Sequence, residues 1–151
     1  MYDKEFYERN YKFQKALADV LAFEIASRYN PRTIIDFGCG CGHFANRIAL
    51  YSGGEAIGFN GDIPDNAEIE IIKRDLSEYI RTIEGDLVIS LEVAEHIEES
   101  KADIFIDTLT LHGNRILFSA ATPGQGGIGH VNEQPHEYWH EKFKQRGYKY
   151  F

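Results

Sequence analysis

Two kinds of hydrophobic spacing alternate along the chain. Short runs of β-branched and apolar residues, bounded by polar residues or glycines, indicate buried strands. We expect strands at 33–37, 55–59, 69–73, 86–91 and 115–119. Apolar residues that recur every three or four positions indicate helices, at 12–29, 43–51, 76–82, 98–111 and 135–145. This alternation predicts a doubly wound α/β fold, with a mostly parallel sheet covered by helices on both faces.

One connection in this pattern is unusually short. Seven residues, 61–67, clearly separate the second expected strand from the third, whereas a parallel crossover usually takes about ten or more. Either the strand boundaries lie a few residues away, or the usual crossover helix is reduced to a loop.

Size, composition and charge limit the possible classes of protein. With 151 residues, of which 43% are hydrophobic, we expect one domain over 1–151, with an N-terminal helical or lid region at 1–30 and the α/β core at 31–151. No apolar run is long enough to span a membrane and no signal peptide is visible, so the expected location is the cytoplasm. The net charge of −8 without a basic cluster disfavours a nucleic-acid partner.

The chemistry of the sequence centres on the loop at 36–42, Asp-Phe-Gly-Cys-Gly-Cys-Gly. Glycines allow a ligand to approach the backbone, and the helix that follows directs free N–H groups at the ligand. The spacing between strand and helix is typical of a nucleotide-binding loop. Asp36 would repel the pyrophosphate of a dinucleotide, which makes a nicotinamide-dependent oxidoreductase less favoured. It suits a cationic amine and a sulfonium, which S-adenosylmethionine carries. Cys39 and Cys41 are expected to be small side chains in a tight turn, since a disulfide there would be strained.

Three segments together resemble a known family. Residues 33–45, 86–97 and 118–124 are similar, in order and spacing, to the first, fourth-strand and fifth-strand motifs of class I S-adenosylmethionine-dependent methyltransferases. The resemblance implies that S-adenosylmethionine is the cofactor. It also implies O- or N-methylation of a small-molecule acceptor, such as a sugar or other metabolite.

The resemblance also implies which residues bind the cofactor. Asp36 would reach its amine directly or through water, and Gly38 and Gly40 would pack against its methionine and ribose parts. The family usually has an acid at the end of the second strand for the ribose; here Asn60 stands there and Asp62 follows, so either residue is a candidate. Asp75 would accept from the adenine, or it caps a helix. Cys39, Leu76 and Leu91 complete the expected cofactor site. The aromatic N-terminal residues Tyr2, Phe6, Tyr7 and Tyr11 would either form a lid over the cofactor or pack on the surface.

The acceptor pocket is expected where the fourth and fifth strands end. Two segments there supply the candidate catalytic residues, Glu95, His96, His130 and Glu133. A histidine can remove a proton from a hydroxyl or amine near neutral pH, and we favour His130 because its glycine-rich loop can close over a substrate. The alternatives are that His96 packs on a helix and that His130 is a polar loop residue. A metal held by His130, Glu133 and His136 is the less favoured hypothesis, and we expect no metal.

The end of the sequence raises a second functional hypothesis. The family usually closes its sheet with two antiparallel strands, and residues 147–151 could begin only the first, so we expect truncated C-terminal strands and an open sheet edge. Either the sequence is a fragment of a longer chain, or this is a reduced version of the fold that covers its open edge by pairing with a second copy as a homodimer. Together with Asn60, the short end also suits a degenerate methyltransferase fold that acts as a cofactor-binding or scaffold protein.

Overall fold

Five parallel strands form the centre of the molecule. In the computed structural model, the backbone is described for residues 4–81 and 83–151, and the side chains for 15–81 and 83–151. The strands are β1 (Thr33–Phe37), β2 (Glu55–Asn60), β3 (Glu70–Lys73), β4 (Leu87–Leu91) and β5 (Ile116–Ser119). They lie in the order β3-β2-β1-β4-β5, and every neighbouring pair is parallel. All five expected strands and the doubly wound fold class are therefore confirmed.

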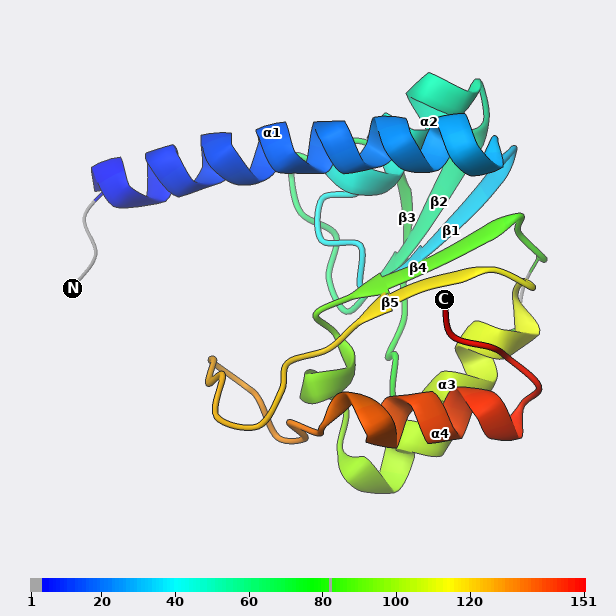
Figure 1. Cartoon of the computed structure of the whole chain (residues 1–151). Helices are drawn as coiled ribbons and strands as arrows, with labels where there is room; N and C mark the ends of the chain where they lie inside the picture. Colours follow the sequence, from blue (N-terminus) through cyan, green and yellow to red (C-terminus); the bar gives the residue numbers. More distant parts are fainter. Residues whose placement is uncertain (1–3, 82) are drawn as a thin grey trace.

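Helices cover both faces of this sheet (Figure 1). They are α1 (Lys4–Tyr29), α2 (His43–Ser52), α3 (Ala102–Leu111) and α4 (His136–Gln145), with the short 3₁₀ turns η1 (Ala94–His96) and η2 (Glu99–Lys101). The pair α1 and α2 packs on one face, and α3 and α4 pack on the other. None of the helices in the described residues is long and apolar enough to cross a membrane.

The strand sequences are apolar on both faces because both faces are buried. Ile34 belongs to the cluster under α1 and α2, whereas its neighbour Ile35 belongs to the cluster under α3 and α4. In β4, Leu87 and Ile89 likewise face α1 and α2, and Val88 faces the opposite layer. Successive side chains of a strand point to opposite faces, so a continuous apolar run supplies two cores at once.

Three expected helices differ from the structure. The helix expected at 76–82 is wrong: residues 76–78 form a turn, and no helix is present in the described residues between β3 and β4. The Ile80 N–H, which an α-helix would direct at the Leu76 carbonyl, donates instead to the Thr108 hydroxyl (3.3 Å). The helix expected at 98–111 begins as η2 and becomes α-helical only at Ala102. The first helix starts at Lys4 rather than at residue 12.

The short connection between β2 and β3 is a loop without a helix, which decides between the two alternatives. The Glu68 N–H donates to the Cys41 carbonyl (2.8 Å), so the loop is tied to the glycine turn after β1. Residues 61–69 therefore support the turn on which the expected cofactor loop is built.

Two earlier expectations concern the ends of the chain: a beginning of a strand at residues 147–151 and an aromatic lid near the N-terminus. Residues 147–151 form no strand; the Tyr148 hydroxyl instead donates to the Thr110 carbonyl (3.0 Å), and burial raises the pKa of Tyr148. The aromatic side chains expected to form a lid, at positions 2, 6, 7 and 11, lie outside the described residues.

Close packing beside β2 leads to a stability prediction. A Cβ at Gly58 would collide with the Cys39 thiol and approach Ile69 Cδ1 to 3.2 Å, whereas a Cβ at Gly61 would meet nothing within 4 Å. We expect Gly58→Ala to lower the free energy of unfolding by about 1–3 kcal/mol, the usual effect of overpacking. Gly61→Ala is the control and should leave it within about 0.5 kcal/mol. Urea denaturation of both variants measures the difference, and equal midpoints would contradict the packing argument.

Candidate functional site

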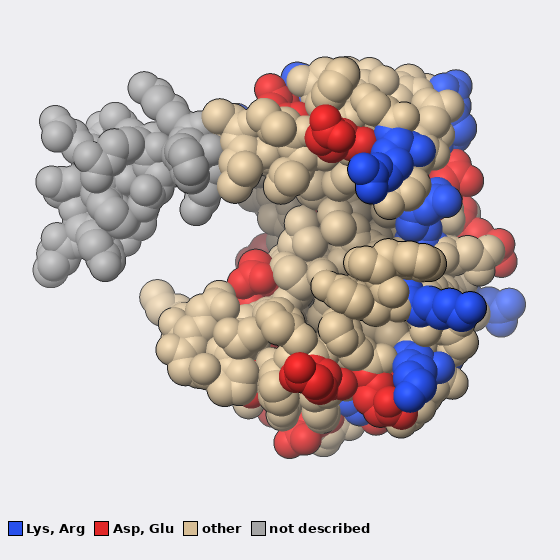
Figure 2. Space-filling view, viewed as in Figure 1, with Lys and Arg blue, Asp and Glu red and all other residues tan. Residues whose placement is uncertain are grey.

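A cavity of about 720 Å³ opens where the strands end. This volume lies within the usual range for small-molecule sites, about 300–1,000 Å³. Its walls come from segments that follow four of the strands: Gly38; Asn60 and Gly61; Lys73, Arg74, Asp75 and Leu76; and Glu92, Val93, His96 and Ile97. The space-filling view shows the molecule hollowed on this side (Figure 2). Segments distant in the sequence thus meet at one edge of the sheet, as expected for a doubly wound fold.

The three glycines of the loop after β1 have different roles, although all have positive φ (85°, 54° and 78°). A Cβ at Gly38 would collide with Val93, and a Cβ at Gly42 would collide with Ile69. A Cβ at Gly40 would meet no protein atom within 4 Å. Gly38 and Gly42 therefore allow tight packing of the loop, and Gly40 leaves open space in front of the backbone.

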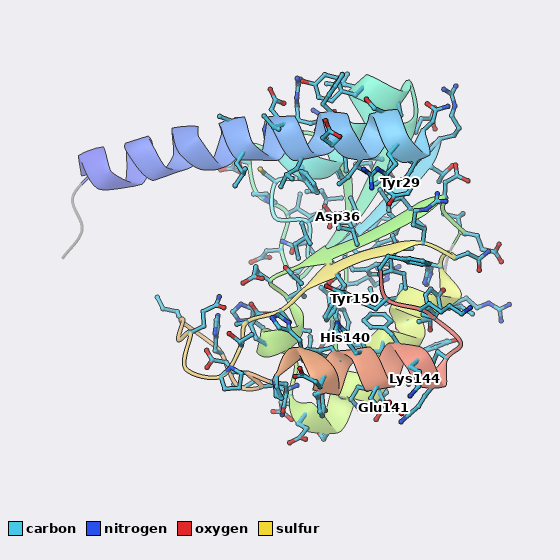
Figure 3. The ribbon with its side chains drawn as sticks, in the orientation of Figure 1. Tyr29, Asp36, His140, Glu141, Lys144 and Tyr150 are labelled. Atoms are coloured by element: carbon cyan, nitrogen blue, oxygen red, sulfur yellow. The ribbon has the colours of Figure 1, made fainter. Side chains whose placement is uncertain are left out.

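Asp36 is a buried carboxylate without a compensating partner. It is the next-to-last residue of β1, on the face covered by α1 and α2 and opposite Gly58 in the register with β2, and only 5% of it is exposed. Figure 3 labels it in the interior of the molecule. No hydrogen bond reaches the carboxylate from the described part of the chain, and burial raises the pKa of Asp36 to about 7. A cationic group placed beside it would stabilise the ionised form.

Cys39 is held against the sheet rather than directed into the cavity. Its thiol packs beside Gly58, and burial, with a smaller effect of the nearby Asp36, raises its pKa to about 12. Both cysteines are free thiols. The Cys39 side chain therefore packs in a tight turn, in agreement with the expectation for this residue.

The structure separates the two candidates for a ribose contact. Asn60 lines the cavity, and its amide donates to the Asp62 carbonyl (2.8 Å). The Asp62 carboxylate is exposed and pairs with Lys73 (2.6 Å), and that hydrogen bond lowers its pKa. Asp62 is absent from the described cavity wall, so Asn60 is the better placed of the two.

Asp75 and Leu76 lie in the cavity wall at the end of β3, as the resemblance implied. One carboxylate oxygen of Asp75 accepts from the Ser77 N–H (2.9 Å), which lowers the pKa of Asp75. This bond closes a turn, and the Ser77 side chain also hydrogen-bonds the Asp75 carboxylate. Leu91 differs from the expectation, because it packs beside the core under α1 and α2 and does not line the cavity.

The exit of β4 contains a feature that the sequence did not reveal. Glu92 has a positive φ of 55°, which costs a non-glycine residue about 1–3 kcal/mol and is found mainly at functional sites. Its carboxylate accepts from the Ser119 hydroxyl (2.7 Å) and from the Gln125 amide (3.0 Å). The sequence places Glu92 directly after the strand but gives no sign of this conformation. Glu92, Val93 and Ile97 are cavity residues outside the expected set.

The four expected catalytic residues do come together. Glu95 and His96 lie in η1, and His130 and Glu133 lie in the loop before α4. The rings of His96 and His130 are 4.9 Å apart, and His130 Nδ1 lies 2.7 Å from a carboxylate oxygen of Glu133. The bond from His130, followed by the N–H groups of Gly124 and Gly126, lowers the pKa of Glu133. Of the four residues, His96 lines the cavity and His130 lies behind it, 12% exposed at its side chain.

Comparison with solved structures identifies the fold. No family model matches the sequence, and no curated protein matches it at the sequence level. A SAM-dependent methyltransferase from Archaeoglobus fulgidus superposes with a TM-score of 0.71 at 18% identity, over 97% of this chain and 75% of that one. Magnesium protoporphyrin IX methyltransferase from Synechocystis PCC 6803 with bound SAH gives 0.67 at 15% identity, over 89% and 73%. A small RNA methyltransferase gives 0.68 at 18%, over 89% and 21%. The chain has the fold of class I SAM-dependent methyltransferases.

The burial of Asp36 leads to a prediction about pH. The folded state holds the Asp36 proton up to about pH 7, whereas the unfolded state loses it near 3.8. The stability of the ligand-free protein therefore falls as the pH rises through this window and then levels off above about 7. We expect Asp36→Asn to remove this fall, so that its stability relative to wild type improves by about 2 kcal/mol between pH 5 and pH 8.

Denaturant titrations at several pH values measure this difference, with the exposed Asp65→Asn as the matched control. Parallel pH profiles for wild type and Asp36→Asn would show that the Asp36 carboxylate is not desolvated.

Proposed function

We propose that this chain is an S-adenosylmethionine-dependent methyltransferase that acts on a small-molecule acceptor. The single observation that carries the proposal is the Asp36 carboxylate, which is buried and receives no hydrogen bond from the described residues, beside a glycine loop in which Gly40 leaves open space. A buried charge of this kind is costly unless a cation neutralises it. S-adenosylmethionine carries an ammonium and a sulfonium, whereas the pyrophosphate of a nicotinamide dinucleotide would add negative charge.

Other residues of the loop and of the cavity wall fit the same cofactor. Gly40, in the loop, allows the ligand to approach the backbone. In the cavity wall, Asn60 offers an amide to the ribose and Asp75 offers a carboxylate acceptor to the adenine amino group. The neighbour from Synechocystis contains SAH in the same fold, which supports this choice. When bound, the cofactor supplies a methyl group on an activated sulfur, so the protein must chiefly position the acceptor and help it lose a proton.

The acceptor side is formed by His96, which lines the cavity, with Glu95 and His130 behind it. A hydroxyl or amine held in front of His96 would face polar groups able to assist its ionisation. The net charge of −8 and the limited cavity volume favour a small acceptor over a nucleic acid. The neighbours act on porphyrins and on small RNA, so the fold alone does not choose the acceptor.

Binding of the cofactor is the first test. Calorimetry should give a dissociation constant in the micromolar range for S-adenosylmethionine or its demethylated product, about −8 kcal/mol, and no binding of NAD. Gly40→Ala should weaken cofactor binding by about tenfold or more, because the new Cβ enters the open space. Gly147→Ala is the matched control: Gly147 also has a positive φ (84°) and no atom near its Cβ, but it lies after α4. Binding of NAD alone would overturn the proposal.

Methyl transfer separates an enzyme from a scaffold. If the protein binds the cofactor but transfers no methyl group to any member of a broad metabolite panel of hydroxyl and amine compounds, the scaffold hypothesis takes the place of the enzyme.

A second prediction concerns the ribose. Asn60→Asp should tighten cofactor binding by about tenfold, because a charged acceptor strengthens the hydrogen bonds to the ribose hydroxyls. Asp62→Ala should change binding by less than about twofold, because its carboxylate pairs with Lys73 at the surface. Calorimetry on both variants measures the affinities. A large loss in Asp62→Ala with no gain in Asn60→Asp would assign the ribose to Asp62.

A further inference from the structure

Three potential metal ligands meet behind the acceptor end of the cavity. Glu95, His96 and His130 each offer one ligand atom, and these atoms all lie within 4.8 Å of one another. Glu95 and His96 come from η1, and His130 comes from the loop that precedes α4; these two segments lie on the same side of the molecule (Figure 1). The loop is fixed to η1, because the Glu95 carbonyl accepts from the N–H groups of Val131 (2.9 Å) and Asn132 (3.0 Å).

The Glu95 carboxylate lacks the partner that its burial requires. Only 1% of the residue is exposed, and neither carboxylate oxygen accepts a hydrogen bond from the described residues. The nearest basic atom is His130 Nε2, 3.9 Å away, which is too far for a hydrogen bond. Carboxylates this deeply buried are normally paired or bound to a metal.

Both histidines are held through Nδ1, which leaves Nε2 as the nitrogen available to a metal. His96 Nδ1 lies 3.1 Å from the Gly129 carbonyl, which can only accept, so Nδ1 is the donor in this contact. His130 Nδ1 donates in the same way to Glu133 (2.7 Å). The second oxygen of Glu133 accepts from the Gly124 N–H (2.8 Å), which fixes the carboxylate in turn. Histidines that bind metals are usually held in this way by a carbonyl or carboxylate at the other ring nitrogen.

We propose that Glu95, His96 and His130 bind a divalent transition-metal ion such as zinc, with an open coordination position toward the cavity. Two histidines and one carboxylate form a common ligand set for catalytic zinc and for other first-row metals. Ligand atoms that share a zinc ion lie about 3.3 Å apart, given bonds of about 2.0–2.2 Å, so a small inward movement from the observed spacing closes the site. The nitrogen ligands disfavour magnesium and calcium.

These ligands differ from the metal set considered from the sequence. Glu133 is occupied as the partner of His130, and His136 instead stacks on His140 within α4 (ring centroids 6.4 Å apart). The sequence expectation of no metal is therefore replaced by a proposal with another set of ligands.

The role of this metal deepens the proposed function and rests on it. His96 lines the cavity, so the open position would take the oxygen of an acceptor hydroxyl and lower its pKa. The hydroxyl proton leaves to solvent, the oxygen lone pair forms the new bond to the methyl carbon, and the carbon–sulfur bond breaks with its electrons on sulfur. A metal in this position accounts for an acceptor side that combines a buried carboxylate with two histidines held through Nδ1.

Metal binding is tested on the full chain after treatment with EDTA and without any cofactor. Calorimetry with Zn²⁺ should give about one ion per chain with a dissociation constant of about 1 µM or lower. Co²⁺ should give visible absorption bands of nitrogen and oxygen coordination without thiolate-to-cobalt bands, which excludes the free thiols Cys39 and Cys41. Absence of stoichiometric binding of both ions would overturn the proposal.

Variants locate the site. Glu95→Gln and His130→Asn should each weaken Zn²⁺ binding by about 100-fold or more, and Glu133→Gln by about 10–100-fold. His140→Asn is the matched control: His140 lies on α4 beside Tyr150 (ring centroids 4.2 Å apart; Figure 3), outside the cluster. If His140→Asn removes the binding and Glu95→Gln does not, the ion belongs to the histidines of α4 and the proposal fails.

Measurements of thermal stability and of cofactor binding distinguish failure of the metal proposal from failure of the proposed function. Glu95→Gln should raise the melting temperature of the metal-free protein, because it removes an unpaired buried charge; a fall would assign Glu95 to a purely structural role. Binding of S-adenosylhomocysteine, measured by calorimetry without metal, should be unchanged in Glu95→Gln. If the metal binds but the cofactor does not, the proposed function fails and the metal site stands. If the cofactor binds and neither ion does, the metal proposal alone fails.

Discussion

The backbone after β1 passes so close to its neighbours that side chains are excluded at two of its three glycines. Val93, at the exit of β4, takes the space beside Gly38, and Ile69, before β3, takes the space beside Gly42. These contacts bring the end of β1, the exit of β4 and the start of β3 together around one turn. The cavity wall then follows from the sheet order, because β2 and β4 both pair with β1 and place Asn60 and Glu92 on either side of the turn. The remaining open glycine, Gly40, is the place where this packing leaves room for a ligand.

Two buried carboxylates determine the electrostatics of the site. Asp36 lies under α1 and α2, and Glu95 lies in η1 after β4, and neither has a hydrogen bond to its carboxylate from the described residues. Burial of an unpaired charge is unfavourable for folding, so each group lowers the stability of the ligand-free protein. Each also becomes favourable once a cation arrives. In our proposals, a site with both features binds a cationic cofactor at one end and a metal ion at the other.

The sequence predicts the strands well and the contacts of the site less well. The five strands follow from apolar runs, because both faces of a parallel sheet are buried and the signal is strong. The helix at 76–82 was wrong because apolar spacing does not distinguish a helix from a turn whose Leu76 and Ile80 happen to pack inward, with the Ile80 N–H bound to Thr108. The roles of Asn60 and Asp62 depend on where Lys73 lies across the β2–β3 pair, and residue spacing contains no information about that contact.

The sequence predicts that Glu95, His96, His130 and Glu133 lie together, but it does not predict how they contact one another. The sequence places two of them after β4 and two after β5, and neighbouring strands bring their exits together. The sequence does not show which of these four residues contact one another. Glu133 binds the N–H groups of Gly124 and Gly126 as well as His130, so one carboxylate both shapes the glycine-rich loop and orients the histidine ring. The αL conformation of Glu92 fixes the other side of that loop through Gln125. The glycine-rich loop is therefore held by the same groups that orient the histidine cluster, and a change in either alters both.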